Sequence, residues 1–310
     1  MQFNKIVIWG LRKRWHTHRF IHQRFYENAK KLGYKVIWVE DEKENAKYIE
    51  KGDLVISAEV IGKMVPEKIT IQDYHLPIID GVFYCLHSFK PTFYKKIDKK
   101  YLLILEKYQN DFEEKGFEKW REAVLFDING QTLYQPWGTN LLDYEFKKPV
   151  YHTHRFIFWI GSIWDNVLKQ GNIRKIEELK STLIKNNLKF IHLRFIPDFL
   201  STFFTRLSRV APAIVGEWQE YHDYLPCRMF QNISYGHVGF SNVKKFKDIL
   251  GEYNINGTIE EMTDKVLRLN EKEYKDLVLK QQEIIKNYTY KNALENIFRA
   301  FDQIKNKYEK

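Results

Sequence analysis

Hydrophobic positions near the start of the chain alternate between short apolar runs and one longer amphipathic stretch. The run KIVIW, Lys5 to Trp9, is short and rich in β-branched residues, which predicts a buried parallel strand. From His18 to Leu32 the apolar residues recur at helical spacing, and Gly33 is a natural stop for that helix. The next run, YKVIWVED, predicts a second strand that ends in acidic residues. Strand, helix, glycine and strand together predict a βαβ unit.

The first half of the chain continues this alternation and becomes less regular towards its end. The patterns predict a short helix in NAKYIEKG, strands in DLVISAEV, KITIQDYHLP, GVFYCLHSF and YLLILEKYQ, and two short strands around the Asn-Gly turn of AVLFDINGQTLYQPW. The stretch from Gln135 to Val150 has two prolines, a glycine and little periodicity, which predicts a connector.

The second half starts a new series of alternating strands and helices. The patterns predict strands in FIFWIGSIW, LKFIHLRF, PAIVGEWQ and HVGFSN, and helices in NIRKIEELKSTLIKNN, FLSTFFTRLSRV and CRMFQNISYG. The segment from Glu271 to Lys310 is polar and helical, with one predicted buried stripe. This alternation predicts a second α/β domain.

Composition and charge narrow the class of protein. The chain has 310 residues, of which 44% are hydrophobic, so it can bury the core of one large or two medium domains. Its net charge of +10 suits a nucleic-acid binder, an anionic membrane surface or a phosphorylated substrate. Because no zinc-finger spacing and no RNA-recognition signature is present, we expect no nucleic acid as a partner. No run is long enough to span a membrane, and the N-terminus lacks the order of a secretory signal, so we expect a cytoplasmic protein.

A heptapeptide recurs with six of seven letters unchanged: HTHRFIH starts at His16 and HTHRFIF starts at His152. The first copy precedes a predicted helix and the second precedes a predicted strand, so we interpret the repeat as coincidental. A His-x-His pair could also bind zinc, but zinc needs further ligands. The candidates are His22, His75, Cys85 and His87, and none stands at a recognised spacing. We therefore predict no metal site.

Open α/β sheets bind ligands beyond the carboxyl ends of their strands, so the loops after strands hold the candidate chemistry. In the first half that loop leads into a helix, whose N-terminus favours anions. His16 and His18 lie there, and a histidine can act as an acid or base near neutral pH. Asp73, at the end of the KITIQD strand, is a third candidate for the catalytic base.

In the second half, Gly161 follows the first predicted strand and lets backbone approach a ligand closely. Ser162 and neighbouring amides could hold a phosphate. Further along, Glu217 and Trp218 are predicted at a strand end, and Arg228 opens a helix. A helix N-terminus combined with an arginine is a good clamp for a diphosphate.

The segment LPCRMFQNISYGHVGFSN resembles the donor-binding segment of GT-B glycosyltransferases. YQPWGTNL resembles their interdomain approach, and KIVIWG with HTHRFIHQRFYENAKKLGYKVIWVED resembles the N-terminal domain of some bacterial and viral members. The resemblance implies an α/β fold of two Rossmann-like domains that face each other across a cleft, with a C-terminal helix crossing back. It implies an acceptor-binding domain over 1–148, a nucleotide-sugar-binding domain over 149–290 and the returning helix over 291–310.

The same resemblance implies a metal-independent glycosyltransferase. It would move a sugar from a nucleotide-diphosphate sugar to a hydroxyl of a glycan or other acceptor, including lipid-linked and protein-linked ones. No cofactor is implied beyond the nucleotide sugar, which is a co-substrate. Arg228, with amides near Asn232 to Tyr235 and near Gly161, would hold the diphosphate, and His16 or His18 would face the acceptor. The implied donor-binding residues are Gly161, Ser162, Glu217, Trp218, Arg228, Gln231, Asn232, Ser234 and Tyr235.

One departure from the family pattern leaves the stereochemical outcome open. Many retaining members carry a Glu-x7-Glu pattern in which one Glu holds the donor ribose, and this chain has Gln231 in the corresponding helix. The ribose contact then passes to Gln231 or Glu217. Two other functions stay open: a sugar-nucleotide epimerase, and a non-catalytic nucleotide- or glycan-binding protein. Peripheral contact with a membrane also stays open, whereas the missing G-x-G-x-x-G disfavours a dehydrogenase.

Overall fold

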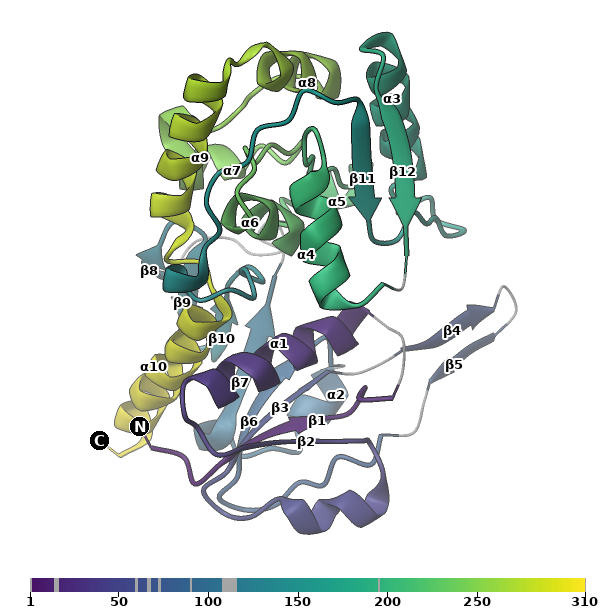
Figure 1. Ribbon diagram of the computed structural model, residues 1–310. Coiled ribbons are helices and arrows are strands. Elements are labelled where there is room, and N and C mark those ends of the chain that lie inside the picture. Colours follow the sequence, from purple (N-terminus) through teal and green to yellow (C-terminus); the bar gives the residue numbers. More distant parts are fainter. Residues whose placement is uncertain are drawn as a thin grey trace. The chain divides into compact units, whose positions relative to one another are not determined.

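The chain divides into two compact units in the computed structural model, which describes residues 2–13, 17–58, 61–65, 68–71, 74–89, 91–107, 116–194 and 196–309. Unit 1 comprises Met1–Lys107, Glu114–Gln135 and Tyr290–Lys310, and unit 2 comprises Tyr108–Glu113 and Pro136–Thr289. Each unit combines helices with parallel strands, so the chain is of the mixed α/β class (Figure 1). The domain boundaries expected from the sequence stay predictions.

Unit 1 is built on an eight-stranded sheet with the order β2-β1-β3-β6-β7-β10-β9-β8. Its strands are β1 (Ile6–Trp9), β2 (Val36–Val39), β3 (Leu54–Ala58), β6 (Phe83–His87), β7 (Leu102–Glu106), β8 (Glu118–Arg121), β9 (Val124–Asp127) and β10 (Thr132–Tyr134). The first six strands in this spatial order are parallel, and β9 is antiparallel to both of its neighbours. The chain adds β2 on one side of β1 and all later strands of this sheet on the other side. The sheet therefore has a topological switch point between β1 and β3, where open α/β sheets place their ligands.

Two long helices cover one face of this sheet. The helices of unit 1 are α1 (Thr17–Lys31), α2 (Pro91–Tyr94) and α10 (Tyr290–Tyr308), with 3-10 helices η1 (Lys43–Tyr48) and η2 (Lys99–Tyr101). Helix α1 connects β1 to β2, and the chain leaves it through Gly33 at φ +81°. The ring of Phe25 in α1 meets that of Tyr290 in α10 edge to face at 5.0 Å. The predicted βαβ unit is confirmed, since β1 is buried throughout and pairs in parallel with β2.

Three local predictions in unit 1 meet different outcomes. The hairpin in AVLFDINGQTLYQPW is confirmed, since β9 and β10 pair antiparallel. Its turn is held by the Asp127 carboxylate, which accepts from the backbone N–H groups of Asn129 and Gly130, both at 2.9 Å. The KITIQDYHLP strand forms β5 (Lys68–Ile71), but it pairs with β4 (Ile61–Val65) in a separate two-stranded sheet. The short helix in NAKYIEKG is a 3-10 helix that starts earlier, at Lys43.

Unit 2 repeats the switch in strand order with fewer regular strands. Strand β11 (Phe156–Ile160) pairs in parallel with β12 (Lys189–Leu193). Extended segment 210–215 lies on the other side of β11, since the Arg209 N–H donates to the Phe156 carbonyl at 2.8 Å. Segment 238–242 follows next, since the Ala213 N–H donates to the Phe240 carbonyl at 2.9 Å. The spatial order is therefore β12, β11, 210–215 and 238–242.

The predictions of regular strands in PAIVGEWQ and HVGFSN are wrong, although both segments are extended. Side chains replace part of the ladder: Asn242 Oδ1 accepts from the Val215 N–H at 2.9 Å, and Ser241 Oγ donates to the Ala213 carbonyl at 2.7 Å. Glu217 was expected at a strand end, but it is the first residue of a short helix. Acidic residues in a first helical turn, here Glu217 and Glu220, favour that helix start.

The helices of unit 2 surround these extended segments. They are α3 (Ile173–Lys185), α4 (Asp198–Leu207), α5 (Glu217–Tyr221), α6 (Cys227–Ser234), α7 (Phe246–Leu250), α8 (Ile259–Arg268) and α9 (Glu271–Ile285), with 3-10 helices η3 (Asp143–Glu145) and η4 (Gly251–Tyr253). One core joins Trp159, Ile214 and Phe240 to Leu179 of α3 and Val278 of α9. The continuous helical segment predicted at the C-terminus is interrupted after α9, and the chain then enters α10 of unit 1.

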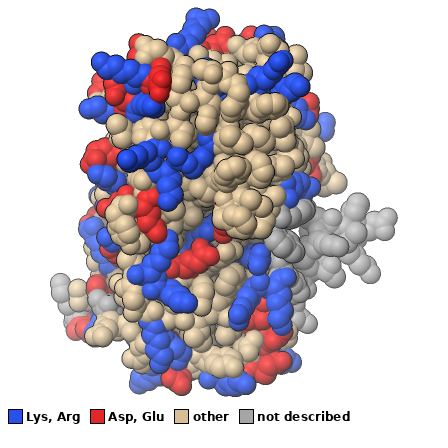
Figure 2. All heavy atoms as spheres, viewed as in Figure 1, with Lys and Arg blue, Asp and Glu red and all other residues tan. Residues whose placement is uncertain are grey.

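Two surface properties bear on the partners. Within the described residues, no helix combines the length and apolarity that crossing a membrane requires. On the face shown in Figure 2, basic and acidic side chains are interspersed over most of the surface. The excess of positive charge is therefore not gathered into one basic patch on that face.

Candidate functional site

Three histidines of unit 1 meet beside the topological switch point. His87 is the last residue of β6, and His18 and His22 lie in the first turns of α1. The backbone of Gly10, directly after β1, lies beside them, because its carbonyl oxygen is 3.2 Å from His22 Nδ1. This is the edge of the sheet where the fold class places ligands.

Hydrogen bonds indicate the tautomers of two members of this histidine cluster (His18, His22 and His87). A carbonyl only accepts, so His22 Nδ1–H donates to Gly10. When His22 is neutral, its Nε2 is then an acceptor, and His87 Nε2–H donates to it across 3.2 Å. The ring of His18 meets that of His87 edge to face, with centroids 5.0 Å apart.

Burial keeps His87 neutral. The side chain is fully enclosed, and burial lowers the pKa of His87 well below its usual value, with His18, His22 and Lys107 adding repulsion of its charged form. Lys107 directly follows β7, so it shares the carboxyl edge of the sheet, and burial lowers its pKa as well. The sequence analysis missed Lys107, although a lysine directly after the buried run LLILE was a usable signal.

Only one of the three predicted catalytic residues can be placed. His16 and Asp73 lie outside the described residues. His18 is half-buried in the histidine cluster, so it stands at the edge where the sequence placed it. His22 and His87 were considered only as metal ligands, and the structure instead pairs them with each other. Within the described part of the chain, no three His, Cys, Asp or Glu side chains form a group suited to a metal.

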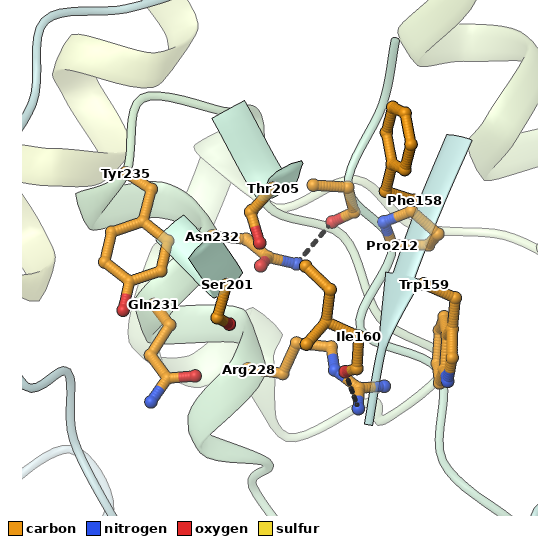
Figure 3. Close-up of a pocket in the computed structure, with 11 residues that line it drawn as sticks. Phe158, Trp159, Ile160, Ser201, Thr205, Pro212, Arg228, Gln231, Asn232 and Tyr235 are labelled. Atoms are coloured by element: carbon orange, nitrogen blue, oxygen red, sulfur yellow. Dashed lines mark hydrogen bonds between the residues drawn. The ribbon is translucent and has the colours of Figure 1, made fainter. Parts of the chain in front are cut away.

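In unit 2, Arg228 is the centre of the predicted donor site. It lies in the first turn of α6, and its Nη2 donates to the carbonyl of Ile160 at 2.8 Å, at the carboxyl end of β11 (Figure 3). Its guanidinium lies over the Trp159 ring, 3.9 Å from the centroid. Gly161, at φ +131°, makes room for this side chain: a Cβ there would lie 2.2 Å from Nη2. Burial lowers the pKa of Arg228 to about 10, so it stays cationic at neutral pH.

A small cavity of about 30 Å³ adjoins Arg228, which is room for a water-sized group. Its walls come from β11, α4, α6 and segment 210–215. Gln231 of α6 and Tyr235, directly after that helix, are among the lining residues. Figure 3 shows the hydroxyls of Ser201 and Thr205 on the α4 side of this cavity. The sequence analysis missed both residues, since hydroxyls on an amphipathic helix carry no local signal of a site.

The other predicted donor-binding residues have structural contacts. Asn232 Nδ2 donates to the Ala211 carbonyl at 2.6 Å, and Ser234, fully buried, donates from Oγ to the Gln231 carbonyl at 2.8 Å. The Tyr235 N–H is used inside the helix, where it donates to the same carbonyl at 2.8 Å. Because α6 begins at Cys227, the amides that can face a ligand belong to its first turn and not to 232–235.

Three residues lie outside this cavity. Ser162 is exposed, and its carbonyl accepts from Asn172 Nδ2 at 3.2 Å. Glu217 is exposed and forms an ion pair with Arg174 at 3.1 Å. The Trp218 ring lies against the His222 ring, with centroids 4.4 Å apart. Contacts of these three residues with a donor stay predictions.

The second HTHRF segment has the structural context expected for a coincidental repeat. It precedes β11, at the opposite end of the strand from Gly161. His152 Nε2 lies 2.8 Å from the Arg206 carbonyl, to which it donates, and the rings of His152 and His154 stack at 4.9 Å. These contacts fix the chain before the strand, whereas His18 stands at a carboxyl edge.

Comparisons with known proteins find likenesses among solved structures. No protein-family model matches the chain, and no curated protein matches it. Among solved structures, it is similar to a UDP-forming α,α-trehalose-phosphate synthase from Burkholderia xenovorans, with a TM-score of 0.46 and 10% identity. That alignment covers 94% of this chain and 80% of the synthase.

Proposed function

We propose that the protein is a GT-B-type glycosyltransferase that moves a sugar from a nucleotide-diphosphate sugar to an acceptor hydroxyl, without a metal ion. The observation that carries the proposal is the placement of Arg228 at the N-terminus of α6, against the carboxyl end of β11. It is supported by the resemblance of the surrounding segment to the donor-binding segment of that superfamily.

Arg228 supplies what a departing diphosphate needs. As the bond from the sugar to the diphosphate breaks, negative charge grows on the phosphate oxygens, and fixed positive groups stabilise it. Trp159 and the Ile160 carbonyl hold the guanidinium in place, and one donated hydrogen bond leaves further N–H groups of the fork for an anion. The N–H groups of the first turn of α6 add the positive end of a helix dipole.

Unit 1 supplies the candidate for proton transfer. In an inverting reaction the acceptor oxygen bonds to the anomeric carbon, the bond from that carbon to the diphosphate oxygen breaks, and the hydroxyl proton passes to a base. His18 is the base we favour among His16, His18 and Asp73. His87 lies beside His18 and is neutral. A proton that passes to His18 therefore meets no positive charge on the His87 ring. That the two units face each other during transfer belongs to the proposal.

The test is a thermal-shift screen of the full chain against nucleoside diphosphates and nucleotide sugars, with and without EDTA. We expect one nucleotide to raise the melting temperature, EDTA to leave this shift unchanged, and Arg228→Met to abolish it. Arg209→Met is the matched control, because Arg209 also lies over an aromatic ring, that of Tyr151 at 5.0 Å, away from the cavity. The control should keep the full shift.

Two results would contradict the proposal. If no nucleotide stabilises the protein, the donor site is absent. If EDTA alone lowers the melting temperature strongly, the protein binds a metal ion that stabilises it, and the histidines become the candidate ligands. Stabilisation without transfer to any acceptor would instead identify a binding protein, and conversion of the nucleotide sugar without an acceptor would identify an epimerase.

A further inference from the structure

A second, larger hollow lies wholly within unit 1, along the free edge of its sheet. We call it the β2 groove: it runs between β2, α1 and η1 and has a volume of about 990 Å³. Tyr26, Trp38 and Tyr48 line it from these three elements. Small-molecule sites fall in the range of about 300–1,000 Å³, so the groove is large enough for an extended ligand of several rings. None of the residues assigned to the donor site or to proton transfer lines it.

The aromatic rings of the groove are held in place. Trp38 donates from its indole N–H to the Gly10 carbonyl at 2.9 Å, which fixes the orientation of the ring. The Tyr26 ring lies next to it, with centroids 6.0 Å apart at 42°. Tyr48 has 42% of its surface exposed. The exposed part of Tyr48, beside the half-buried Tyr26 and Trp38, suits a ligand with flat C–H surfaces.

The formal charges of the groove cancel. Three basic residues line it, Arg12, Lys13 and Arg19, together with three acidic ones, Glu27, Glu40 and Glu42. Some of them neutralise each other directly, as Lys13 Nζ does with Glu42 at 3.4 Å. The chain as a whole carries +10, so this local balance argues against an anionic ligand such as a nucleic acid or a phosphate polymer.

The groove also disfavours a peptide that would extend the sheet. The carbonyls of Lys35 and Val39 accept from β1, so by alternation the polar backbone groups of Trp38 point outward from the sheet. Arg12 Nη1 already donates to the outward carbonyl of Trp38 at 3.1 Å. A charged side chain at an edge strand is one way in which proteins prevent strand addition.

We propose that the β2 groove binds a neutral oligosaccharide. Each sugar hydroxyl both donates and accepts, which matches a wall of paired cations, carboxylates and the amides of Gln23 and Asn45, and the sugar rings present C–H faces to the aromatic residues. Arg19 directly follows His18 in α1, so one end of a bound chain would lie near the candidate base. The inference rests on the proposed function only in this last step, where the bound glycan is the acceptor.

The test uses the full chain on an array of neutral and anionic glycans, followed by calorimetric titration of the best neutral hexasaccharide. We expect selective retention of neutral glycans and a loss of at least tenfold in affinity in Tyr48→Ala. Tyr34→Ala is the matched control, because Tyr34 is equally exposed at 42%, belongs to unit 1 and lies outside the groove. Its affinity should stay within twofold of the unchanged protein.

Three outcomes would overturn the inference: no neutral glycan is retained, anionic glycans are preferred, or Tyr48→Ala and Tyr34→Ala behave alike. The test is independent of the proposed function, because glycan binding requires neither a nucleotide nor Arg228. Glycan binding without any nucleotide effect would refute the transferase and keep the groove. A nucleotide effect without glycan binding would refute the groove and keep the donor site.

Discussion

The two units of the chain share an order of extended segments and differ in how that order is held. In each, the second strand lies on one side of the first and the later segments lie on the other, so each has a switch point beside its first strand. Unit 1 holds the order with regular ladders between its strands, whereas the described part of unit 2 has a regular ladder only between β11 and β12. Beyond β11, the side chains of Ser208 and Asn242 accept hydrogen bonds from backbone N–H groups and that of Ser241 donates one to a carbonyl, which helps to hold the segments.

The difference extends to the polar residues at each switch point. Unit 1 presents a histidine cluster in which burial keeps His87 neutral, and unit 2 presents a permanently charged arginine beside a glycine. Proton transfer needs a group that changes its charge near neutral pH, and anion binding needs one that does not. The proposed function thus assigns two different chemistries to one arrangement of strands, and the following experiments test that division.

The largest effect should come from His18→Ala. If unit 1 supplies proton transfer and unit 2 supplies donor binding, this change lowers the turnover number at least 100-fold, because general-base catalysis contributes about 10²–10⁴. It should leave the melting-temperature shift caused by the nucleotide unchanged. A steady-state assay of sugar transfer, run beside the thermal-shift titration, measures both. Loss of nucleotide binding in His18→Ala would contradict the division of roles.

The next effect is acid destabilisation through buried neutral histidines in both units. In unit 2, burial lowers the pKa of His237 to about 3, and the residue bonds through Nδ1 to the Tyr274 hydroxyl at 2.9 Å. The unfolded chain takes up a proton near pH 6.5 and the folded chain does not, so stability is present above that pH and is lost as the pH falls from 6.5 towards 3. At pH 5 the loss from His237 is about 2 kcal/mol, and His87 in unit 1 acts in the same direction.

Urea unfolding at pH 7 and pH 5 measures this loss, and hydrogen exchange resolves it by unit. His237→Gln should flatten the pH dependence for peptides of unit 2, and His87→Gln should flatten it for peptides of unit 1. Equal stability of the unchanged protein at both pH values would show that neither histidine is held neutral.

A comparable effect, confined to unit 2, should follow Ser208→Ala. Ser208 Oγ accepts from the Phe158 N–H at 3.0 Å and donates to the Val210 carbonyl at 2.7 Å, with the side chain fully buried. Its removal leaves a backbone N–H without this acceptor, at a cost of about 1–3 kcal/mol in the free energy of unfolding. The control is Ser57→Ala in unit 1, where an equally buried hydroxyl makes only a long bond of 3.4 Å to the Trp9 carbonyl. Equal losses in urea unfolding would show that unit 2 does not depend on side-chain hydrogen bonds.

The smallest effect should separate backbone strain from the position of Arg228. Gly161→Ala and Gly33→Ala both place a side chain at positive φ, but only the first puts a Cβ against a neighbour, Arg228 Nη2. Both should lower the melting temperature. Only Gly161→Ala should weaken nucleotide binding, by about tenfold or 1.4 kcal/mol, measured by calorimetry. If both variants bind equally well, the close approach of Gly161 to Arg228 has no role in the donor site.

Much of the fold could be predicted because its signals are local. The apolar run before Gly10, the helix before Gly33 and the Asn-Gly turn each depend on residues within a few positions of one another, and all three are present. The start of a helix at Arg228 was predicted on the same basis, and Arg228 lies in the first turn of α6. Glu217 was misplaced, although the acidic first turn after Gly216 was a local sign of a helix start.

What the sequence by itself determined is thus the set of elements and the residues at their ends. Only the tertiary structure decided which ends meet. His22 and His87 are 65 positions apart. They meet because His22 lies in the helix that follows β1, and His87 ends β6, which is separated from β1 by β3 alone in the sheet. Lys107 joins the same edge because β7 pairs with β6. Arg228 reaches Ile160 across 68 positions because α6 lies beside segment 210–215, where Asn232 donates to the Ala211 carbonyl. Strand order and helix packing result from burying apolar faces of the whole chain. These contacts join residues that are far apart in sequence, so no short stretch of residues predicts them.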